Sequence, residues 1–178
     1  ALGGINQNMV VSWPARIKDK GALREQFVHV IDVVPTILEA AGLRSPEVVD
    51  GIKQKPIEGT SFLYTFDKAN ASVPTKHKIQ YFEMMGQWAL YDDGWFLSTK
   101  VNRAPWEAFG PANPDPLNNQ VLELYNLNED FSQTNDLAAK HPEKVKEMKD
   151  KFIAEGNKYQ VFPMDASVAS RIVAPRPN

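Results

Sequence analysis

An Asp-Gly turn between two aromatic-rich segments constrains the fold of this chain more than any other feature. The stretch QWALYDDGWFLSTK, residues 87–100, has Asp93 and Gly94 at its centre. Asp-Gly supplies the positive φ angles that a two-residue hairpin turn requires, and the flanking residues favour strands. IQYFEM at residues 79–84 and VLELYNL at residues 121–127 are also typical of strands. We therefore predict a small antiparallel sheet in this part of the chain.

A long amphipathic helix is predicted to follow the strands, over residues 142–159. Pro142 suits its first turn, because that N–H has no partner within a helix. Its apolar stripe comprises Val145, Met148, Phe152 and Tyr159. A sheet covered on one face by a helix is a stable two-layer arrangement, here assigned to residues 79–162. Residues 163–178 are expected to form a proline-rich tail.

A buried strand and a short helix are predicted nearer the N-terminus. The segment MVVSW, residues 9–13, is interpreted as a buried strand, which Pro14 ends because proline has no N–H for the ladder. Residues 33–41 have helical spacing, with Asp32 at the N-cap and Gly42 at the C-cap. The apolar face of this helix comprises Val34, Ile37, Leu38 and Ala41.

This strand and helix fit a two-layer sheet and helix poorly. They are typical of the edge of a larger α/β layer, so the predicted fold class is α/β overall and α+β in the C-terminal part. Residues 1–45 are assigned to the end of that α/β domain. Residues 46–78 are expected to be a connecting segment, because prolines and polar residues are scattered along it.

Composition excludes several classes of function. The net charge is -2 with 20 Lys+Arg residues scattered among acids, which argues against nucleic-acid binding. There is no cysteine, which excludes disulfides, thiolate metal sites and a cysteine nucleophile. No apolar run approaches the roughly 18 to 20 residues of a membrane span, and the first residues do not resemble a signal peptide. The composition is compatible with both a periplasmic and a cytoplasmic location.

Several motifs, in order along the chain, resemble the C-terminal portion of the sulfatase family, within the alkaline phosphatase superfamily. The matching stretches are GGINQNMVVSWPARI, HVIDVVPTILEAAGL, PIEGTSF, YFEM, ALYDDGWFLST and LELYNLNEDFSQTNDLA. The last stretch is the most specific. The resemblance covers residues 2–160, and the tail with VFPMD looks most like the longer bacterial arylsulfatases.

The resemblance implies a parent enzyme that hydrolyses sulfate esters. A formylglycine hydrate would attack sulfur, and a calcium ion held by Asp and Asn side chains would neutralise the sulfate oxygens. In the family, nearly all catalytic residues precede the Gly-Gly loop, so no nucleophile, metal ligand or catalytic lysine carries over to this chain. The loop residues Gly3, Gly4 and Asn6 are the only candidates near substrate, and Asn6 stands where some relatives have arginine.

Ser12 is the most tempting candidate nucleophile, because Ser12-Trp13-Pro14-Ala15-Arg16 matches the core of the formylglycine signal. The family signal continues with leucine and Thr-Gly, whereas Ile17 follows here. The nucleophile also lies at a helix N-terminus, where backbone N–H groups favour an anion. Ser12 is expected at a strand end instead, so we interpret it as structural. A second near-match at residues 72–76 lies in a predicted loop.

Other candidate sites also have structural explanations. The histidines His29, His77 and His141 lie far apart in the sequence, unlike metal ligands on one helix; His29 is interpreted as packing or capping and His141 as a helix start. The segment NLNEDFSQTNDL, residues 126–137, lacks the glycine and glutamate of a calcium loop and is read as a turn. The sequon at Asn70 has meaning only in a eukaryotic secretory protein.

We therefore interpret the chain as a C-terminal fragment of a sulfuric ester hydrolase that lacks the catalytic residues, carries no cofactor itself and is inactive alone. Two alternatives stay open: a fragment of a phosphonate or phosphate monoester hydrolase of the same superfamily, and a stand-alone interaction module. The expected partner is the N-terminal catalytic part, or a second copy through the exposed sheet edge. A fragment should expose apolar surface around Val10, Val11 and Ile37.

Overall fold

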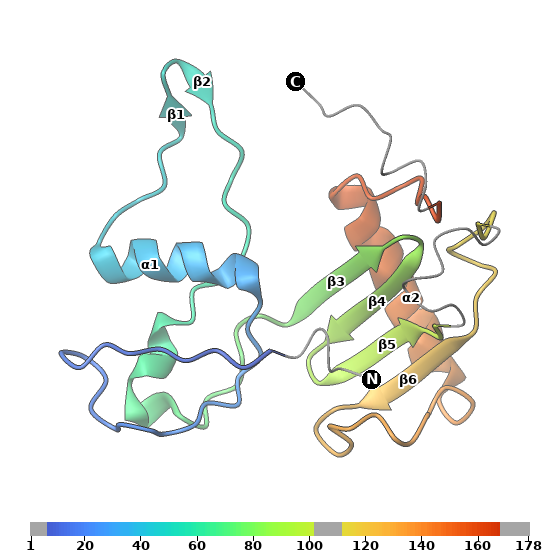
Figure 1. Cartoon of the computed structure of the whole chain (residues 1–178), viewed down its shortest axis with the longest axis horizontal. Helices are drawn as coiled ribbons and strands as arrows, with labels where there is room; N and C mark the ends of the chain where they lie inside the picture. The colour runs from blue at the N-terminus through green and yellow to red at the C-terminus, as the bar shows by residue number, and fades with distance from the viewer. Residues whose placement is uncertain (1–6, 102–111, 168–178) are drawn as a thin grey trace. The chain divides into compact units, whose positions relative to one another are not determined.

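The computed structural model describes residues 7–101 and 112–167. The chain divides into two compact units, and the division falls between Lys78 and Ile79 (Figure 1). We call residues 7–78 the N-terminal unit and the described residues from Ile79 onward the C-terminal unit. No helix in the described part of the chain is long and apolar enough to cross a membrane.

The C-terminal unit contains a four-stranded antiparallel sheet with the strand order β3-β4-β5-β6. The strands are β3 (Ile79–Met84), β4 (Gln87–Asp92), β5 (Trp95–Thr99) and β6 (Leu122–Asn126). Each strand pairs with the next along the chain. Two-residue turns join β3 to β4 and β4 to β5, whereas residues 100–121 separate β5 from β6. Asp93 and Gly94 have φ angles of 45° and 94°, which confirms the predicted hairpin turn.

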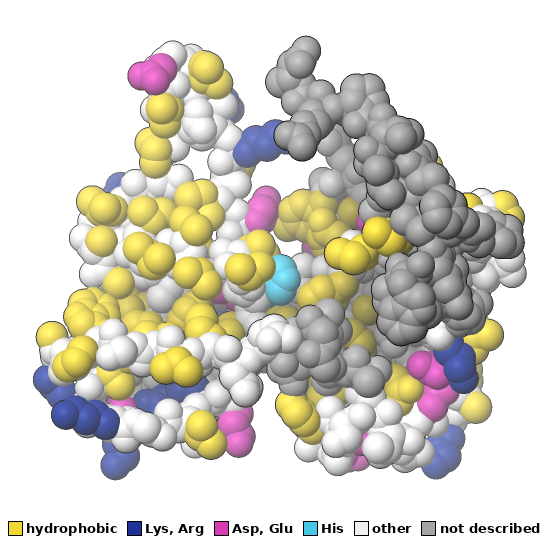
Figure 2. Space-filling view, viewed as in Figure 1, with side chains coloured by type: hydrophobic (Ala, Val, Ile, Leu, Met, Phe, Trp, Pro, Cys, Tyr) yellow, Lys and Arg dark blue, Asp and Glu magenta, His cyan; other side chains and the backbone are white. Residues whose placement is uncertain are grey.

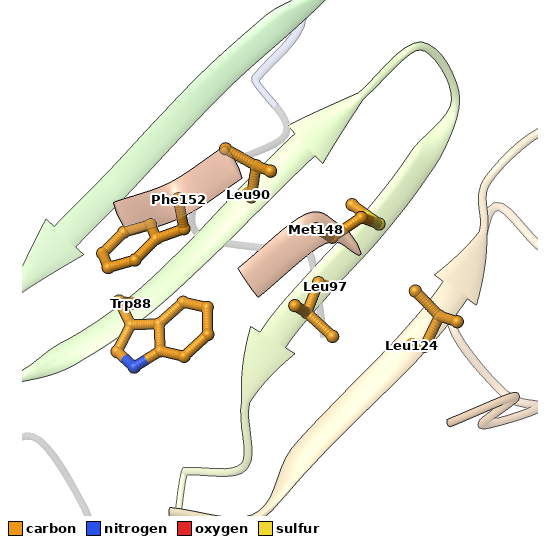
Figure 3. Packing of buried hydrophobic residues seen from close by; sticks show 6 residues of the cluster. All are labelled: Trp88, Leu90, Leu97, Leu124, Met148 and Phe152. Carbon is orange, nitrogen blue, oxygen red and sulfur yellow. The ribbon is translucent and has the colours of Figure 1, made fainter. Parts of the chain in front are cut away.

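Helix α2 (Pro142–Lys158) covers one face of this sheet and buries the predicted stripe. His141 precedes it at the N-cap, as expected. The core comprises Trp88, Leu90, Leu97, Leu124, Met148 and Phe152 (Figure 3). The rings of Trp88 and Phe152 stack with centroids 4.3 Å apart. The sheet therefore holds the helix through one apolar face, and the mixed α+β class predicted for this part is confirmed.

The N-terminal unit is built around the helix α1 (Val33–Ala41), whose bounds agree with the prediction. Gly42 has a φ of 69°, and its N–H donates to the last turn, so it caps the helix as expected. The other elements are η2 (Val30–Asp32), β1 (Val48–Val49), β2 (Ile52–Lys53), η3 (Leu63–Phe66) and η4 (Lys68–Asn70). The helix η3 packs on α1, and residues 46–78 lie in the same compact unit as α1.

Residues 9–13 do not form the predicted buried strand. The segment has no regular secondary structure, and 92% of the Val10 side chain is exposed. A strand needs a neighbour to satisfy its backbone groups, and no described strand pairs with this segment. The apolar face predicted for α1 is exposed as well at Val34 and Ile37, while the opposite side buries Thr36. Residues 9–13 and α1 therefore have sequences typical of a larger α/β layer, but no such layer covers them among the described residues.

Candidate functional site

The predicted substrate-proximal residues Gly3, Gly4 and Asn6 lie outside the described residues. Ser12 lies on an exposed irregular segment. A turn follows it, in which the N–H groups of Arg16 and Ile17 donate to the carbonyl of Trp13. Among the described residues, no helix begins at Ser12 to stabilise an anion there.

A buried pair of ionisable side chains, Asp32 and His77, forms the most organised polar cluster of the N-terminal unit. The Nδ1 atom of His77 lies 2.8 Å from Oδ1 and 2.7 Å from Oδ2 of Asp32. Asp32 is fully buried, and only 8% of His77 is exposed. A buried carboxylate requires such partners, because removing it from water is costly. The pair joins residues 45 positions apart in the sequence.

Two backbone groups complete the environment of the Asp32 carboxylate. The N–H of His29 donates to Oδ2 at 2.7 Å, and the N–H of Thr60 donates to Oδ1 at 2.7 Å. Both oxygens thus accept two close contacts each. Asp32 occupies the N-cap position of α1 as predicted, but its side chain makes no cap hydrogen bond to that helix, because these other donors engage it.

The backbone at Gly59 passes close to the carbonyl of Ile31, next to Asp32. Its φ is 105°, and a Cβ atom there would collide with the carbonyl of Ile31. Glycine allows this backbone conformation and leaves the space that the crossing needs. Thr36 holds the same loop from the other side, since its Oγ1 donates to the carbonyl of Asp32 and accepts from the N–H of Phe62.

The rings of Phe27 and His29 pack against the ring of His77. The ring of His77 makes edge contacts with Phe27 at 5.4 Å and with His29 at 6.3 Å between centroids. Burial lowers the pKa of His29, and the nearby His77 lowers it further, while Asp32 raises it. His29 also lies at the N-cap of η2, in agreement with the predicted packing or capping role.

The contacts of this cluster hold separate stretches of the backbone together. The Asp32 carboxylate accepts from a donor on each of three such stretches. Its position ties residue 77, just before β3, to the start of α1 and to the loop at Thr60.

The sequence did not predict the pairing of Asp32 with His77, because the two residues are 45 positions apart. His29 and His77 are also far apart in the chain. The structure brings these two histidines together, whereas His141 lies in the C-terminal unit beside Trp95. No short-range pattern marks a pairing between a helix start and a residue before a strand, so the sequence held no signal for it.

The proposed turn at residues 126–137 is closed by its own hydrogen bonds. The Asp130 carboxylate accepts from the N–H groups of Thr134 and Asn135, both at 2.8 Å. These contacts lower the pKa of Asp130. Across residues 7–101 and 112–167, no group of three or more histidine, aspartate or glutamate side chains is placed to hold a metal ion.

Comparison with known proteins points to sulfatases. A segment of the chain is 34% identical over 67 residues to the ulvan-active sulfatase of Formosa agariphila, covering 34% of this chain and 13% of that protein. No family model matches the chain. The resemblance to a sulfatase is confirmed. The chain spans only a small part of that relative, so the similarity describes a portion of such an enzyme.

The chain also resembles parts of solved structures. Ps i-CgsB is 18% identical, with a TM-score of 0.50 over 82% of this chain and 29% of that protein. A second structure, solved with its substrate D-glucosamine-2-N,6-O-disulfate, is 17% identical, with a TM-score of 0.46 over 74% of this chain and 24% of that protein. At these identities the first likeness describes the fold alone, and the second is too slight for any argument.

Proposed function

We propose that this chain is the C-terminal portion of a sulfuric ester hydrolase, where it completes the fold and forms one wall of the active-site cleft. The observation that carries the proposal is the similarity of its 67-residue segment to the ulvan-active sulfatase. The order of the sulfatase-like motifs supports it as well. That relative's name indicates a sulfated polysaccharide, so we extend the proposal to sulfated carbohydrates as the substrate class of the parent.

The described residues do not fit the groups that sulfatase chemistry requires. They offer no cluster of carboxylates for calcium, and the chain has no cysteine to become formylglycine. Ser12 lacks the helix N-terminus that such a nucleophile occupies. We therefore assign calcium and formylglycine to the remainder of the parent enzyme, and assign this chain a structural role.

The test compares two proteins. One is the 178-residue chain. The other is the product of the coding sequence that includes the polypeptide encoded directly upstream of Ala1. Both are incubated with calcium and with an aryl sulfate, with ulvan and with an aryl phosphonate.

We expect sulfate release by the longer product and none by the chain alone. Ser12→Ala should leave the activity of the longer product unchanged. Preferential cleavage of the phosphonate would support the alternative hydrolase instead. Sustained sulfate release by the chain alone that disappears in Ser12→Ala would contradict the proposal.

A further inference from the structure

Residues 13–24 of the N-terminal unit form a basic loop. The loop contains four basic side chains and one acid, which gives it a net charge of +3 in a chain whose net charge is -2. The basic residues are Arg16, Lys18, Lys20 and Arg24. Lys and Arg side chains gather over this loop at the lower left of the space-filling view (Figure 2). Positive charge is therefore concentrated on this stretch, although the chain as a whole is slightly acidic.

Arg24 holds the basic loop in place. Its Nε atom donates to the carbonyl of Thr65 in η3 at 2.6 Å, and its Nη2 atom donates to the carboxylate of Asp19 at 2.6 Å. Asp19 is the acid of the loop, so this ion pair compensates its charge. The loop is thus joined to an ordered element, and its carboxylate is already engaged.

The other three cations of the loop remain available to an anion. Arg16, Lys18 and Lys20 are exposed. In the described part of the chain, none of these three side chains forms an ion pair. Lys18 donates to two backbone carbonyls earlier in the loop, and these neutral acceptors leave its positive charge uncompensated.

Lys68 adds a further cation from η4. The hydrogen bond from Arg24 lowers the pKa of Asp19 most, burial opposes it, and the charge of Lys68 contributes to the lowering. Lys68 is exposed and therefore lies within electrostatic range of the loop. With the neighbouring acids Glu25 and Asp67 included, five cations stand against three acids. We call Arg16, Lys18, Lys20 and Lys68 the basic patch.

An indole ring lies beside the basic patch. The guanidinium carbon of Arg16 lies 5.7 Å from the centroid of the Trp13 ring. An edge contact with Phe66, at 6.3 Å between centroids, fixes that ring, while part of Trp13 stays exposed. The loop therefore offers an apolar aromatic surface and a planar hydrogen-bond donor side by side.

We propose that the basic patch and Trp13 form a binding site for a sulfated polysaccharide. The choice of ligand class rests on the proposed function. A sulfate ester is an anion with several acceptor oxygens, which suits both the forked donors of arginine and the compact charge of lysine. The C–H groups on the face of a sugar ring pack on the exposed part of the indole.

Charge density favours a polysaccharide over a nucleic acid. Double-stranded DNA carries one negative charge per about 1.7 Å of its axis and requires a wide basic footprint. The basic patch is confined to one loop and η4, and the chain outside it is acidic. A sulfated polysaccharide places sugar rings between its charges, which matches a few cations around one aromatic ring.

Binding by the 178-residue chain tests the site without any need for catalysis. Affinity electrophoresis compares ulvan, chemically desulfated ulvan and duplex DNA as ligands. We expect ulvan to bind at least about tenfold more tightly than either of the other two. Added salt should weaken the binding, because it screens exposed charges.

Charge-matched variants locate the site. Arg16→Gln combined with Lys20→Gln should weaken the binding of ulvan about fivefold to tenfold, the scale of two exposed ion pairs. Lys53→Gln combined with Lys55→Gln removes the same charge and should change the affinity less than about twofold. These control residues are exposed, and the β1–β2 hairpin lies on the opposite side of α1 from the basic loop (Figure 1).

The aromatic part of the site has its own variants. Trp13→Leu should weaken the binding of ulvan several-fold, while Trp13→Phe keeps an aromatic ring and should retain most of the affinity. Far-UV circular dichroism of both variants should match that of the wild-type chain. Equal affinities of the two variants and the wild-type chain would remove Trp13 from the site and overturn the proposal.

The remaining outcomes separate this inference from the proposed function. Binding of ulvan without sulfate release by the longer product supports the site and contradicts the hydrolase. Sulfate release by the longer product without binding of ulvan by the 178-residue chain supports the hydrolase and overturns the site. Equal losses in the two charge-matched variants would reduce the binding to unspecific attraction, and equally tight binding of DNA would assign the patch to nucleic acid; both results overturn the proposal.

Discussion

At the scale of single residues, the N-terminal unit depends on Asp32. Its buried carboxylate accepts from His77 and from two backbone N–H groups, so replacing one oxygen by an NH₂ group leaves donors facing donors. We predict that Asp32→Asn lowers the free energy of unfolding by about 3 kcal/mol, the scale of a broken buried pair. Urea unfolding followed by tryptophan fluorescence measures the change.

The matched control for this prediction is Asp50→Asn. Asp50 is exposed in the β1–β2 turn with a φ of 49°, a conformation that asparagine tolerates well. Asp50→Asn should change the free energy of unfolding by less than about 0.5 kcal/mol. Equal effects of the two substitutions would show that the Asp32–His77 pair contributes no more to the free energy of unfolding than an exposed aspartate does.

His29 makes the stability of the same unit depend on pH. Burial and His77 hold the pKa of His29 below its ordinary value of 6.5, with Asp32 acting in the opposite direction. The unfolded chain therefore binds the proton more readily than the folded chain, and stability falls as the pH drops below about 6.5 towards the folded-state pKa. His29→Gln should flatten this decline, measured as unfolding midpoints between about pH 7.5 and 5. A decline of unchanged slope in the variant would assign it to other groups.

These residues also show where sequence reasoning ends. Asp32 before a helical stretch was read as a capping residue, and its position is the predicted one. Its true partner is 45 residues away, and nothing local distinguishes a cap from a buried pair. The close approach of Gly59 to the carbonyl of Ile31 could not be predicted either, because a glycine in the sequence does not show which part of the backbone it approaches.

At the scale of elements, local signals identified the C-terminal unit well. The Asp93-Gly94 turn, the strands around it and the amphipathic stripe of α2 each depend on neighbouring residues, and the structure contains all of them. The hairpin sequence also predicts that Trp88 and Trp95 lie across from one another and pack on the helix stripe, and the first part of this prediction is wrong. Trp95 lies opposite Asp92 rather than Trp88, because the two-residue turn sets the register. Trp88 does pack on the helix stripe as expected.

The packing of α2 on the sheet yields a prediction for this unit. Phe152 is fully buried against Trp88, so Phe152→Ala removes a large side chain from a closed core. We predict a loss of about 3–5 kcal/mol in the free energy of unfolding. Phe131→Ala serves as the control, because 66% of Phe131 is exposed and its loss should cost under about 0.5 kcal/mol. Chemical denaturation of both variants decides; a small effect of Phe152→Ala would mean that α2 is not held by this core.

At the scale of the whole molecule, the sequence indicated a larger α/β layer that the chain does not contain within its described residues. The segment at residues 9–13 and the helix at residues 33–41 were predicted from local patterns as parts of that layer. Only the helix forms, because helical hydrogen bonds are internal to the segment, whereas a strand takes its partners from elsewhere. The strand prediction at Val10 and Val11 is therefore wrong within the described residues, where no strand pairs with this segment.

The exposed apolar residues predict how the isolated chain behaves in solution. Val10, Val34 and Ile37 lie in water, so the 178-residue chain should bind the dye ANS and should elute earlier from a sizing column as its concentration rises. Replacing these three residues together by serine should reduce dye binding several-fold and remove the concentration dependence. Their side chains contribute little to the folded unit, so far-UV circular dichroism should stay unchanged.

Serine at Leu23 provides the control, because 85% of Leu23 is exposed and it lies outside both residues 9–13 and α1. It should leave both readings nearly unaltered. If serine at Leu23 reduced dye binding as much as the triple change, dye binding and self-association would arise from scattered apolar residues rather than from Val10, Val34 and Ile37. If the wild-type chain bound no dye and stayed monomeric at all concentrations, the described exposure would not persist in solution, and the chain would behave as a self-sufficient module.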